Sequence, residues 1–186
     1  MLTNDVKSQL QMGRFERTED GIFVPSSRLL INGVFRYSKR GEPEEFSENL
    51  VVDQGLNYLI AAAIGDTSVI SSWYIAPFSG DVTVLASWTA ANFTANATEF
   101  TAYSSATRPA WGSGTVASGG VDSFSDKAEI ASTSDSQVIR GAALISASAK
   151  SNTSGTLMAA SRFPSDKNLD TGEILDIGYG LQLTAA

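Results

Sequence analysis

The stretch Glu173–Leu183, EILDIGYGLQL, alternates large apolar residues with small or polar ones. The residues of one parity are Leu175, Ile177, Tyr179, Leu181 and Leu183. A period of two is that of a β-strand, whose successive side chains point to opposite faces of a sheet. The stretch therefore predicts a strand with these five side chains on its buried face.

Similar short apolar runs, separated by Ser, Gly, Asn and Asp, occur along most of the chain after residue 70. They are Ser72–Phe78, Glu99–Tyr103, Lys127–Ala131, Gln137–Ile145 and Gly155–Phe163. Runs of this length bounded by turn residues are typical of a β-sandwich. The run Gln137–Ile145 is apolar on both parities, which predicts a strand covered on both faces near the centre of a sheet.

One helix is expected, over residues 53–64. Leu56, Leu59, Ile60, Ala63 and Ile64 recur at helical spacing. Asp53 is of the type that caps a helix N-terminus, and Gly65 is of the type that ends a helix. The residues alone thus predict an all-β antiparallel sandwich with one short helix.

The composition excludes several kinds of chemistry. The chain has no His and no Cys, so it cannot build a zinc site of the usual ligands, a Ser-His-Asp triad or a disulfide. Carboxylates are the remaining acids and bases, and they fall mostly in predicted turns, where Asp is favoured for local hydrogen bonds. No spacing indicates a catalytic pair or a calcium loop, so we expect no enzyme activity, cofactor or metal.

The charge and hydropathy pattern bears on partners and location. The 186 residues carry 13 basic and 20 acidic groups, a net charge of −7, which argues against a dedicated nucleic-acid binder. The longest apolar stretch, residues 59–64, is far shorter than the roughly 18 residues of a membrane span. Residues 1–10 lack the pattern of a signal peptide. We expect a protein made in a cytoplasm that does not engage a membrane.

Charge density divides the chain. The first 50 residues hold 7 basic and 8 acidic groups, whereas the other 136 hold 6 and 12. We interpret residues 1–45 as an extended N-terminal arm, with short strands and a possible turn at Asn32-Gly33, and residues 46–186 as the sandwich domain. The basic residues expected to bind a partner are Arg14, Arg17, Arg28, Arg36, Lys39 and Arg40.

The aromatic residues are expected mainly in the core, with one exception. Trp88 lies in a Ser-, Thr- and Asn-containing segment without a strand pattern, so we predict an exposed aromatic there. An exposed tryptophan would suit an interface anchor.

The block Glu99–Trp111 predicts a rigid loop across one end of the sandwich. Pro109 biases Arg108 toward extended geometry, and Trp111 can cover the stem of an arginine. Tyr103, Arg108, Pro109 and Trp111 therefore form either a structural loop corner or part of an interface.

The order of several motifs resembles that of a family of tailed-bacteriophage virion proteins, the capsid decoration or cement proteins. The segments that carry the resemblance are Gly55–Ile60, Ser72–Phe78, Glu99–Trp111, Arg140–Ile145, Lys150–Leu157 and Gly172–Ile177. It covers about residues 50–184, and the charged N-terminal arm is longer than that family leads us to expect.

The resemblance implies a jelly-roll-like sandwich on the outer surface of a virion, made in the host cytoplasm. Its partner would be the major capsid protein, whose subunit contacts it would stabilise as a dimer or trimer, without enzyme activity. The alternative hypothesis is a tail-fibre or head-fibre component that binds host surface glycans through exposed aromatic residues.

Overall fold

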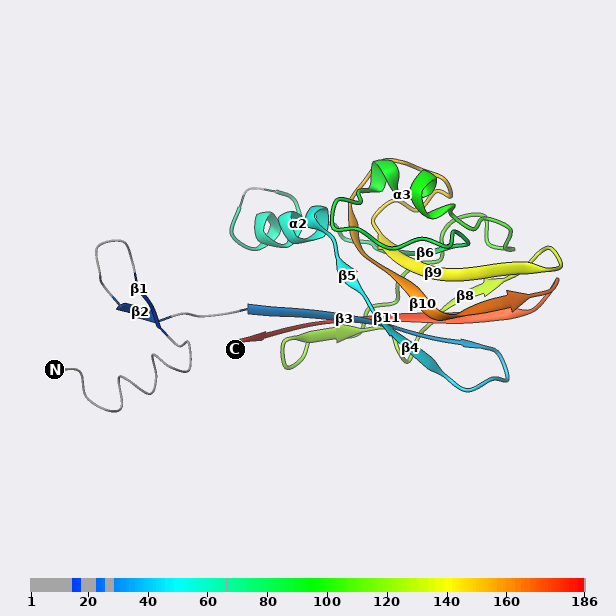
Figure 1. Ribbon diagram of the computed structural model, residues 1–186, viewed down its shortest axis with the longest axis horizontal. Coiled ribbons are helices and arrows are strands. Elements are labelled where there is room, and N and C mark those ends of the chain that lie inside the picture. The colour runs from blue at the N-terminus through cyan, green and yellow to red at the C-terminus, as the bar shows by residue number, and fades with distance from the viewer. Residues whose placement is uncertain (1–14, 18–22, 26–28, 66, 186) are drawn as a thin grey trace. The chain divides into compact units, whose positions relative to one another are not determined.

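The computed structural model describes residues 15–17, 23–25, 29–65 and 67–185 (Figure 1). Its elements are, in chain order, β1 (Phe15–Arg17), β2 (Phe23–Pro25), β3 (Leu29–Lys39), β4 (Glu45–Glu48), β5 (Leu50–Val51), α2 (Asp53–Ile64), β6 (Tyr74–Phe78), α3 (Ala90–Ala97), β7 (Gly120–Asp122), β8 (Ala128–Ala131), β9 (Gln137–Ile145), β10 (Leu157–Leu169) and β11 (Ile174–Ala185).

The chain divides into two compact units. One consists of Met1–Ile31 with Leu183–Ala186, and the other of Asn32–Gln182. In the first unit, β1 and β2 form a separate antiparallel two-stranded sheet in which Phe15 lies opposite Pro25.

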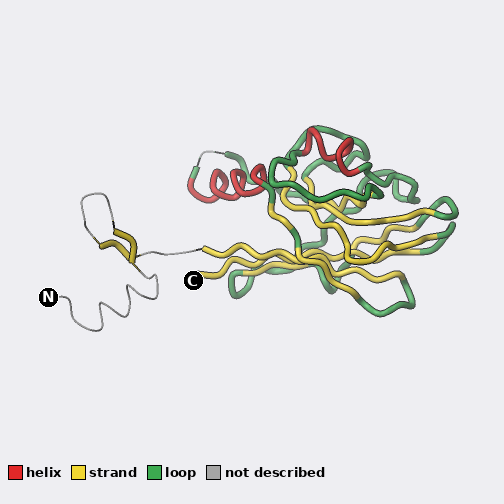
Figure 2. The backbone as a smooth tube through the Cα atoms, viewed as in Figure 1, coloured by secondary structure: helices red, strands yellow, loops and turns green. Residues whose placement is uncertain are grey.

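The second unit is built on two antiparallel sheets, one stacked on the other (Figure 2). One sheet has the strand order β5-β10-β9-β6, and the other has the order β4-β3-β11-β7, with β8 also paired to β11. The predicted all-β class with two antiparallel sheets is confirmed. It follows from the many short apolar runs, each of which needs a neighbouring strand to satisfy its backbone.

The main core lies between the two sheets. Leu175, Ile177 and Tyr179 of β11 are fully buried there, as the alternation of Glu173–Leu183 predicted. Across β3 and β10, the Tyr37 and Phe163 rings stack with centroids 3.8 Å apart. Aromatic pairs of this kind add to the stability that area burial alone supplies.

A second, smaller core lies on the other face of the β5-β10-β9-β6 sheet, beneath α3. Ala143 and Ile145 of β9 belong to this core, whereas Leu144 belongs to the main core. The strand predicted from Gln137–Ile145 is therefore covered on both faces. It also lies inside its sheet, between β10 and β6, which confirms that prediction.

Helix α2 spans the predicted residues 53–64. Its N-cap is Val52, and Asp53 is the first helical residue. The sequence predicted Asp53 as the N-cap, which is one position away from its place in the structure. As the first helical residue, its carboxylate is still favoured by the positive end of the helix dipole.

The predicted boundary of the N-terminal arm at residue 45 does not match the division of the chain. Residues 32–45 belong to the larger unit, and Phe35 and Tyr37 of β3 are fully buried in the main core. The predicted turn at Asn32-Gly33 is wrong as well, because both residues lie inside β3. Of the charged residues in this segment, Arg36 lies on the outward face of β3, and Arg40, Glu42 and Glu44 lie in the connection to β4. A count of charges along the chain does not show that the apolar residues between them are buried.

Within the described part of the chain, no helix is long and apolar enough to cross a membrane.

Candidate functional site

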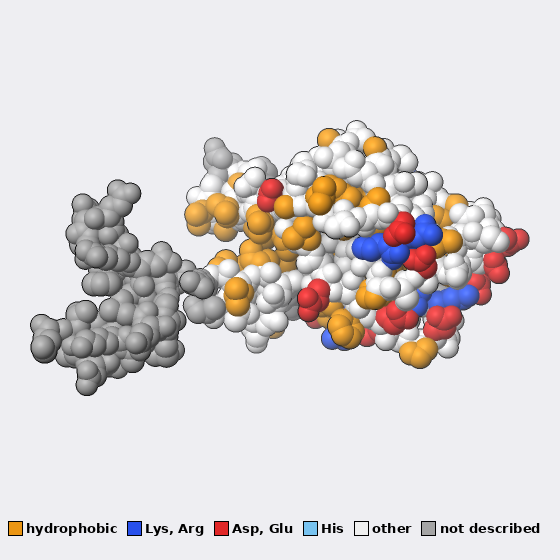
Figure 3. All heavy atoms as spheres, in the orientation of Figure 1, with side chains coloured by type: hydrophobic (Ala, Val, Ile, Leu, Met, Phe, Trp, Pro, Cys, Tyr) orange, Lys and Arg blue, Asp and Glu red, His pale blue; other side chains and the backbone are white. Residues whose placement is uncertain are grey.

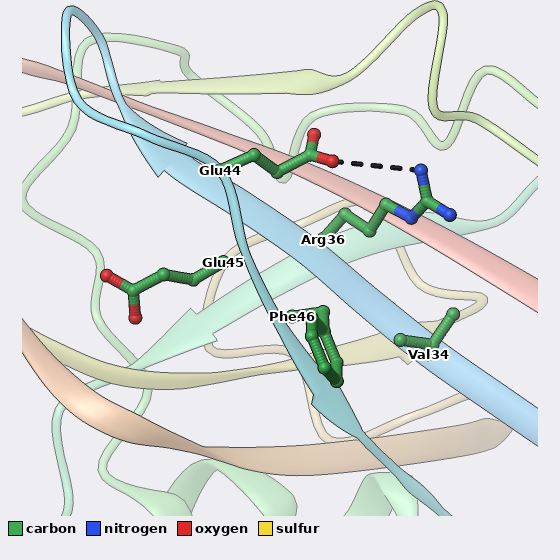
Figure 4. Close-up of a pocket in the computed structure, with 5 residues that line it drawn as sticks. All are labelled: Val34, Arg36, Glu44, Glu45 and Phe46. Carbon is green, nitrogen blue, oxygen red and sulfur yellow. Dashed lines mark ion pairs between the residues drawn. The ribbon is translucent and has the colours of Figure 1, made fainter.

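The candidate site is a groove on the outer face of the sheet that contains β3 and β4. It has a volume of about 310 Å³ and is lined by Val34, Arg36, Glu44, Glu45 and Phe46 (Figure 4). Because Phe35 and Tyr37 point into the core, Val34 and Arg36 of β3 point outward. The register pairs Arg36 with Phe46 of β4, which brings these two residues side by side.

Arg36 is held in place from two sides. Its guanidinium carbon lies 4.2 Å from the centroid of the Phe124 ring, and its Nη1 lies 3.7 Å from Glu44 Oε1 (Figure 4). Lys127 Nζ also donates to Glu44. A cation over an aromatic face is attracted by the ring quadrupole, so the ring and the carboxylate together order an arginine whose side chain is 47% exposed.

Two glycines of β11 make room for the Phe124 ring. A Cβ atom at Gly180 would lie 2.6 Å from Phe124 Cζ, and one at Gly178 would lie 3.2 Å from Phe124 Cδ1. The ring therefore covers the outer face of β11, where a side chain at Gly180 would force it to move and one at Gly178 would crowd it. These glycines, which the sequence pattern showed only as small residues, determine where Arg36 can stack.

Glu45, which also lines the groove, ties β4 to β10. Its carboxylate accepts hydrogen bonds from Lys167 Nζ and, at 2.7 Å, from Ser165 Oγ. These bonds, the one from Lys167 first, hold the pKa of Glu45 below its ordinary value. Tyr37 OH lies 3.4 Å from Glu45, and burial, followed by the nearby carboxylate, raises the pKa of Tyr37.

Phe46 is the exposed aromatic residue of this part of the surface, with 67% of its area accessible. Both carboxylates of the groove, Glu44 and Glu45, are paired with lysines. The arrangement suits contact with a partner surface, in which arginine and aromatic side chains typically contribute most of the binding energy.

The six basic residues predicted to bind a partner differ in their surroundings. Arg14 and Arg28 lie outside the described residues, and Arg17 is the last residue of β1. Of the four that the structure describes, Arg36 alone lines the groove.

Lys39 and Arg40, at the end of β3, form ion pairs within the sandwich. Lys39 Nζ lies 2.7 Å from Glu173, and Arg40 Nη2 lies 2.5 Å from Glu129 and 2.8 Å from Asp176. The hydrogen bond to Glu173 raises the pKa of Lys39. These two cations join the end of β3 to strands β8 and β11. They therefore stabilise the sandwich itself, whereas the sequence predicted that they belong to an extended arm and bind a partner.

The block around Arg108 has the geometry of a loop corner. The Arg108 side chain is fully buried and Tyr103 is 3% exposed, so neither presents its side chain at the surface. The Pro109 carbonyl accepts a hydrogen bond of 2.9 Å from the backbone of Ile75 in β6. Trp111 Nε1 donates to the Tyr179 carbonyl at 3.0 Å, so the indole contacts β11 rather than covering the arginine.

The prediction that Trp88 is exposed is wrong, because the structure leaves only 3% of this residue accessible. Trp88 immediately precedes the N-cap of α3, Thr89, and its ring packs against Phe93 with centroids 6.5 Å apart. Asn92 Oδ1 accepts a hydrogen bond of 2.8 Å from Thr89 N. The glycan-binding alternative thereby loses the residue that we expected to anchor a sugar.

A sequence signal for α3 existed and was missed. An apolar residue before the cap that packs on the fourth helical residue is a hydrophobic staple, and Thr with a polar residue three positions later resembles a capping box. Both patterns are present in Trp88–Phe93. They would have indicated a helix start and a buried tryptophan.

Comparisons with protein-family models, with curated proteins and with solved structures find no match to this chain.

Proposed function

We propose that this protein is a virion structural protein that binds the outer surface of a bacteriophage capsid and stabilises contacts between major capsid protein subunits. The observation that carries the proposal is Arg36, stacked on Phe124 and paired with Glu44, beside the exposed Phe46 on the outer face of the sheet. A jelly-roll-like connection of the strands and a location in the virion, both implied by the family resemblance, are part of the proposal.

The physical argument starts from the cost of ordering side chains on binding. An arginine already stacked on Phe124 and paired with Glu44 loses less conformational freedom when a partner carboxylate approaches. Arginine also makes bidentate contacts with carboxylates, which give direction as well as affinity. Phe46 supplies apolar area next to it. These are the residue types that dominate protein–protein interfaces.

The N-terminal unit supports the same proposal. Its strands β1 and β2 have three residues each and form a sheet of their own. An isolated two-stranded sheet is at best marginally stable in water, so a partner surface would stabilise it. We propose that residues 1–31, rather than 1–45, reach a neighbouring capsid subunit.

Cohesion would come from many copies. A modest contact at each site is sufficient when a symmetric shell presents hundreds of sites. Residues 51–186 carry 6 basic and 12 acidic groups, which suits an outer surface that does not bind the packaged genome.

The test is cosedimentation of the purified chain with undecorated capsid shells, read as bound copies per shell at saturation. We expect saturable binding that is weakened about tenfold or more by Phe46→Ala and by Arg36→Ala. Arg40→Ala is the matched control, because Arg40 is an equally exposed arginine of the same segment that pairs with Glu129 and Asp176.

The outcomes separate the parts of the proposal. If the wild-type chain does not bind shells, the decoration function is wrong. If binding is unaffected by both groove variants but is lost on deletion of residues 1–28, the contact lies in the N-terminal unit.

A further inference from the structure

Asn32-Gly33 is the one Asn-Gly pair among the eight asparagines of the chain. When glycine follows asparagine, its backbone nitrogen can attack the side-chain amide, because glycine has no Cβ atom to hinder the approach. The structure places this pair inside β3 rather than in a turn. The two residues therefore combine a reactive sequence with a backbone that a β-sheet holds extended.

The packing of β3 favours glycine after Asn32. A Cβ atom at Gly33 would lie 2.1 Å from Asn49 Oδ1 and 2.6 Å from the hydroxyl oxygen of Tyr179, which is fully buried. Asn49 N also donates to the Gly33 carbonyl at 3.1 Å. A larger residue would have to displace Asn49 or the buried tyrosine, so the reactive pair is a consequence of the fold.

The Asn32 side chain lies on the outer face of the sheet. It is exposed and has the same parity as Val34 and Arg36. No residue from Leu29 to Phe35 is charged. In the space-filling view, the charged side chains gather toward the end of the sandwich where β3 connects to β4 (Figure 3). The Asn32 amide is therefore accessible to water and has few charged neighbours.

We propose that Asn32 is a deamidation site, at which the folded chain is modified whenever this part of β3 opens. Gly33 N forms a bond to Asn32 Cγ, and the side-chain nitrogen leaves as ammonia with the proton from Gly33 N. Water then adds to the resulting succinimide and breaks one of its two C–N bonds, which gives aspartate or isoaspartate. The reaction consumes one water and needs no oxidant or cofactor. The inference does not depend on the proposed capsid function.

The extended backbone limits the rate of this reaction. The succinimide ring closes only when Asn32 Cβ and Gly33 N lie nearly eclipsed about the Cα–C bond, and the dihedral angles of a β-strand keep these atoms apart. The hydrogen bond from Asn49 N holds the Gly33 peptide in the strand conformation. Closed pairing therefore protects Asn32, and only an opened strand permits the attack.

This part of β3 is placed where opening is easiest. Its neighbour β4 is the edge strand of the sheet and has four residues. The first residues of β3, Leu29 and Leu30, are 61% and 49% exposed. Strand ends with few buried apolar contacts open more readily than the core of a protein. Asn32, three residues from the start of β3, is within reach of such opening.

Isoaspartate would change the strand itself. The main chain would then pass through the former Asn32 side chain and gain one carbon, which interrupts the alternation of side chains between the two faces. Residues 29–31 would no longer continue the ladder formed by the rest of β3. Asn32 is also the first residue of the larger unit, so this change would fall at the boundary between the two units.

Trypsin provides a direct assay, because cleavage after Arg28 and Arg36 releases a peptide whose sole asparagine is Asn32. The folded chain is incubated at mildly alkaline pH, and mass spectrometry follows the gain of about one mass unit in peptide 29–36. We expect conversion at least about tenfold slower than in the chain unfolded by guanidinium chloride. Guanidinium concentrations below the unfolding transition should accelerate it.

Two controls are built into the chain. Peptide 151–162 contains Asn152, whose Oδ1 accepts a hydrogen bond of 2.7 Å from Ser154 N and which precedes the β-branched Thr153. It should stay unconverted over the same period. Asn32→Asp introduces the charge without the extra carbon, so this variant should unfold at the same denaturant concentration as the wild type. The converted chain, separated by anion exchange, should contain isoaspartate and unfold at a lower concentration.

Three results would overturn the inference. Conversion of the folded chain as fast as that of the unfolded chain would show that β3 does not control the reaction. A folded chain that never converts would show that opening does not reach Asn32. Conversion of Asn152 before Asn32 would place the reactive site elsewhere.

Discussion

Arg108 and Glu99 form a buried bidentate ion pair, with Nε 2.8 Å from Oε1 and Nη2 2.8 Å from Oε2. Arg108 also donates to the Ala147 and Asn152 carbonyls, and Glu99 also accepts from Ser151 N and Thr94 Oγ1. The pair therefore joins the segment after α3 to the loop between β9 and β10.

Breaking this pair should be costly. We expect Glu99→Gln and Arg108→Met each to lower the free energy of unfolding by about 3–5 kcal/mol, because each leaves the other group unpaired in the interior. Urea denaturation measures the effect, and the double variant should lose less than the sum of the two. Arg40→Ala, which breaks exposed pairs, should cost much less than either buried-pair variant. Single variants as stable as the wild type would show that the pair is solvated.

The packing of Trp88 under α3 predicts a second effect. Trp88→Ala should destabilise the fold by about 3–5 kcal/mol, because it removes a large side chain from the core that contains Phe78 and Phe93. Asn92→Ala should cost about 1 kcal/mol through loss of the bond to Thr89 N. In a chain with Trp73→Phe and Trp111→Phe, the emission of Trp88 should be blue-shifted and protected from iodide. Emission like that of free tryptophan would mean that the residue is exposed.

Gly141 in β9 should not tolerate a side chain. A Cβ atom there would lie 2.1 Å from Phe78 Cζ and 2.3 Å from the Ser161 carbonyl oxygen. Gly141→Ala should lower the unfolding free energy by about 1–3 kcal/mol or more, because the backbone of β10 must move. Gly120→Ala is the control, since its nearest neighbour would be 3.5 Å away. Equal midpoints in urea for the two variants would contradict the prediction.

Acid should destabilise the protein through its ion-paired carboxylates. The bonds from Lys167 to Glu45 and from Lys39 to Glu173 hold the pKa of each carboxyl below its ordinary value of 4.5. A depressed folded pKa contributes stability that is present above pH 4.5 and is lost as the pH falls through the folded value. Stability measured by urea titration should therefore fall below about pH 4.5. Glu45→Gln should make that fall shallower, and an unchanged pH profile would contradict the role of this pair.

The alkaline limit should be set by three buried tyrosines. Burial raises the pKa of Tyr37, Tyr103 and Tyr179 above the ordinary value of 10, so ionisation opposes folding. Stability should fall as the pH rises above about 10, where the unfolded chain releases these protons and the folded chain keeps them. In a chain with Tyr58→Phe and Tyr74→Phe, absorbance at the phenolate band should rise only as near-ultraviolet circular dichroism is lost. A rise that precedes unfolding would show that these phenols are accessible.

Local sequence patterns predicted the class of the fold and several elements within a residue or two. The alternation in β11 identified its buried side chains Leu175, Ile177 and Tyr179 because one face of that strand meets the core and the other does not. Helix α2 could be located because its apolar spacing continues for three turns and Gly65 ends it. Such signals depend on residues close together in the chain.

The groove could not be predicted in this way. Arg36, Phe46 and Phe124 come from three segments, and they meet only because β4 pairs with β3 in one register and because Gly178 and Gly180 leave space for a ring. The sequence marked Arg36 as a basic residue of a supposed arm, with no indication that it stacks on a distant phenylalanine.

Only the tertiary structure shows which charged residues are buried and which carboxylate each one pairs with. Arg108 and Lys39 have the same sign, but one lies in the interior opposite Glu99 and the other at a strand end beside Glu173. The amino-acid sequence alone was enough to predict the strand periodicity and helix α2, because these depend on residues close together in the chain. It was also enough to exclude His and Cys chemistry, because that depends on composition. The packing of Gly33, the burial of Trp88 and the partners of each charge required the folded chain, because each depends on which surfaces the two sheets and α3 cover.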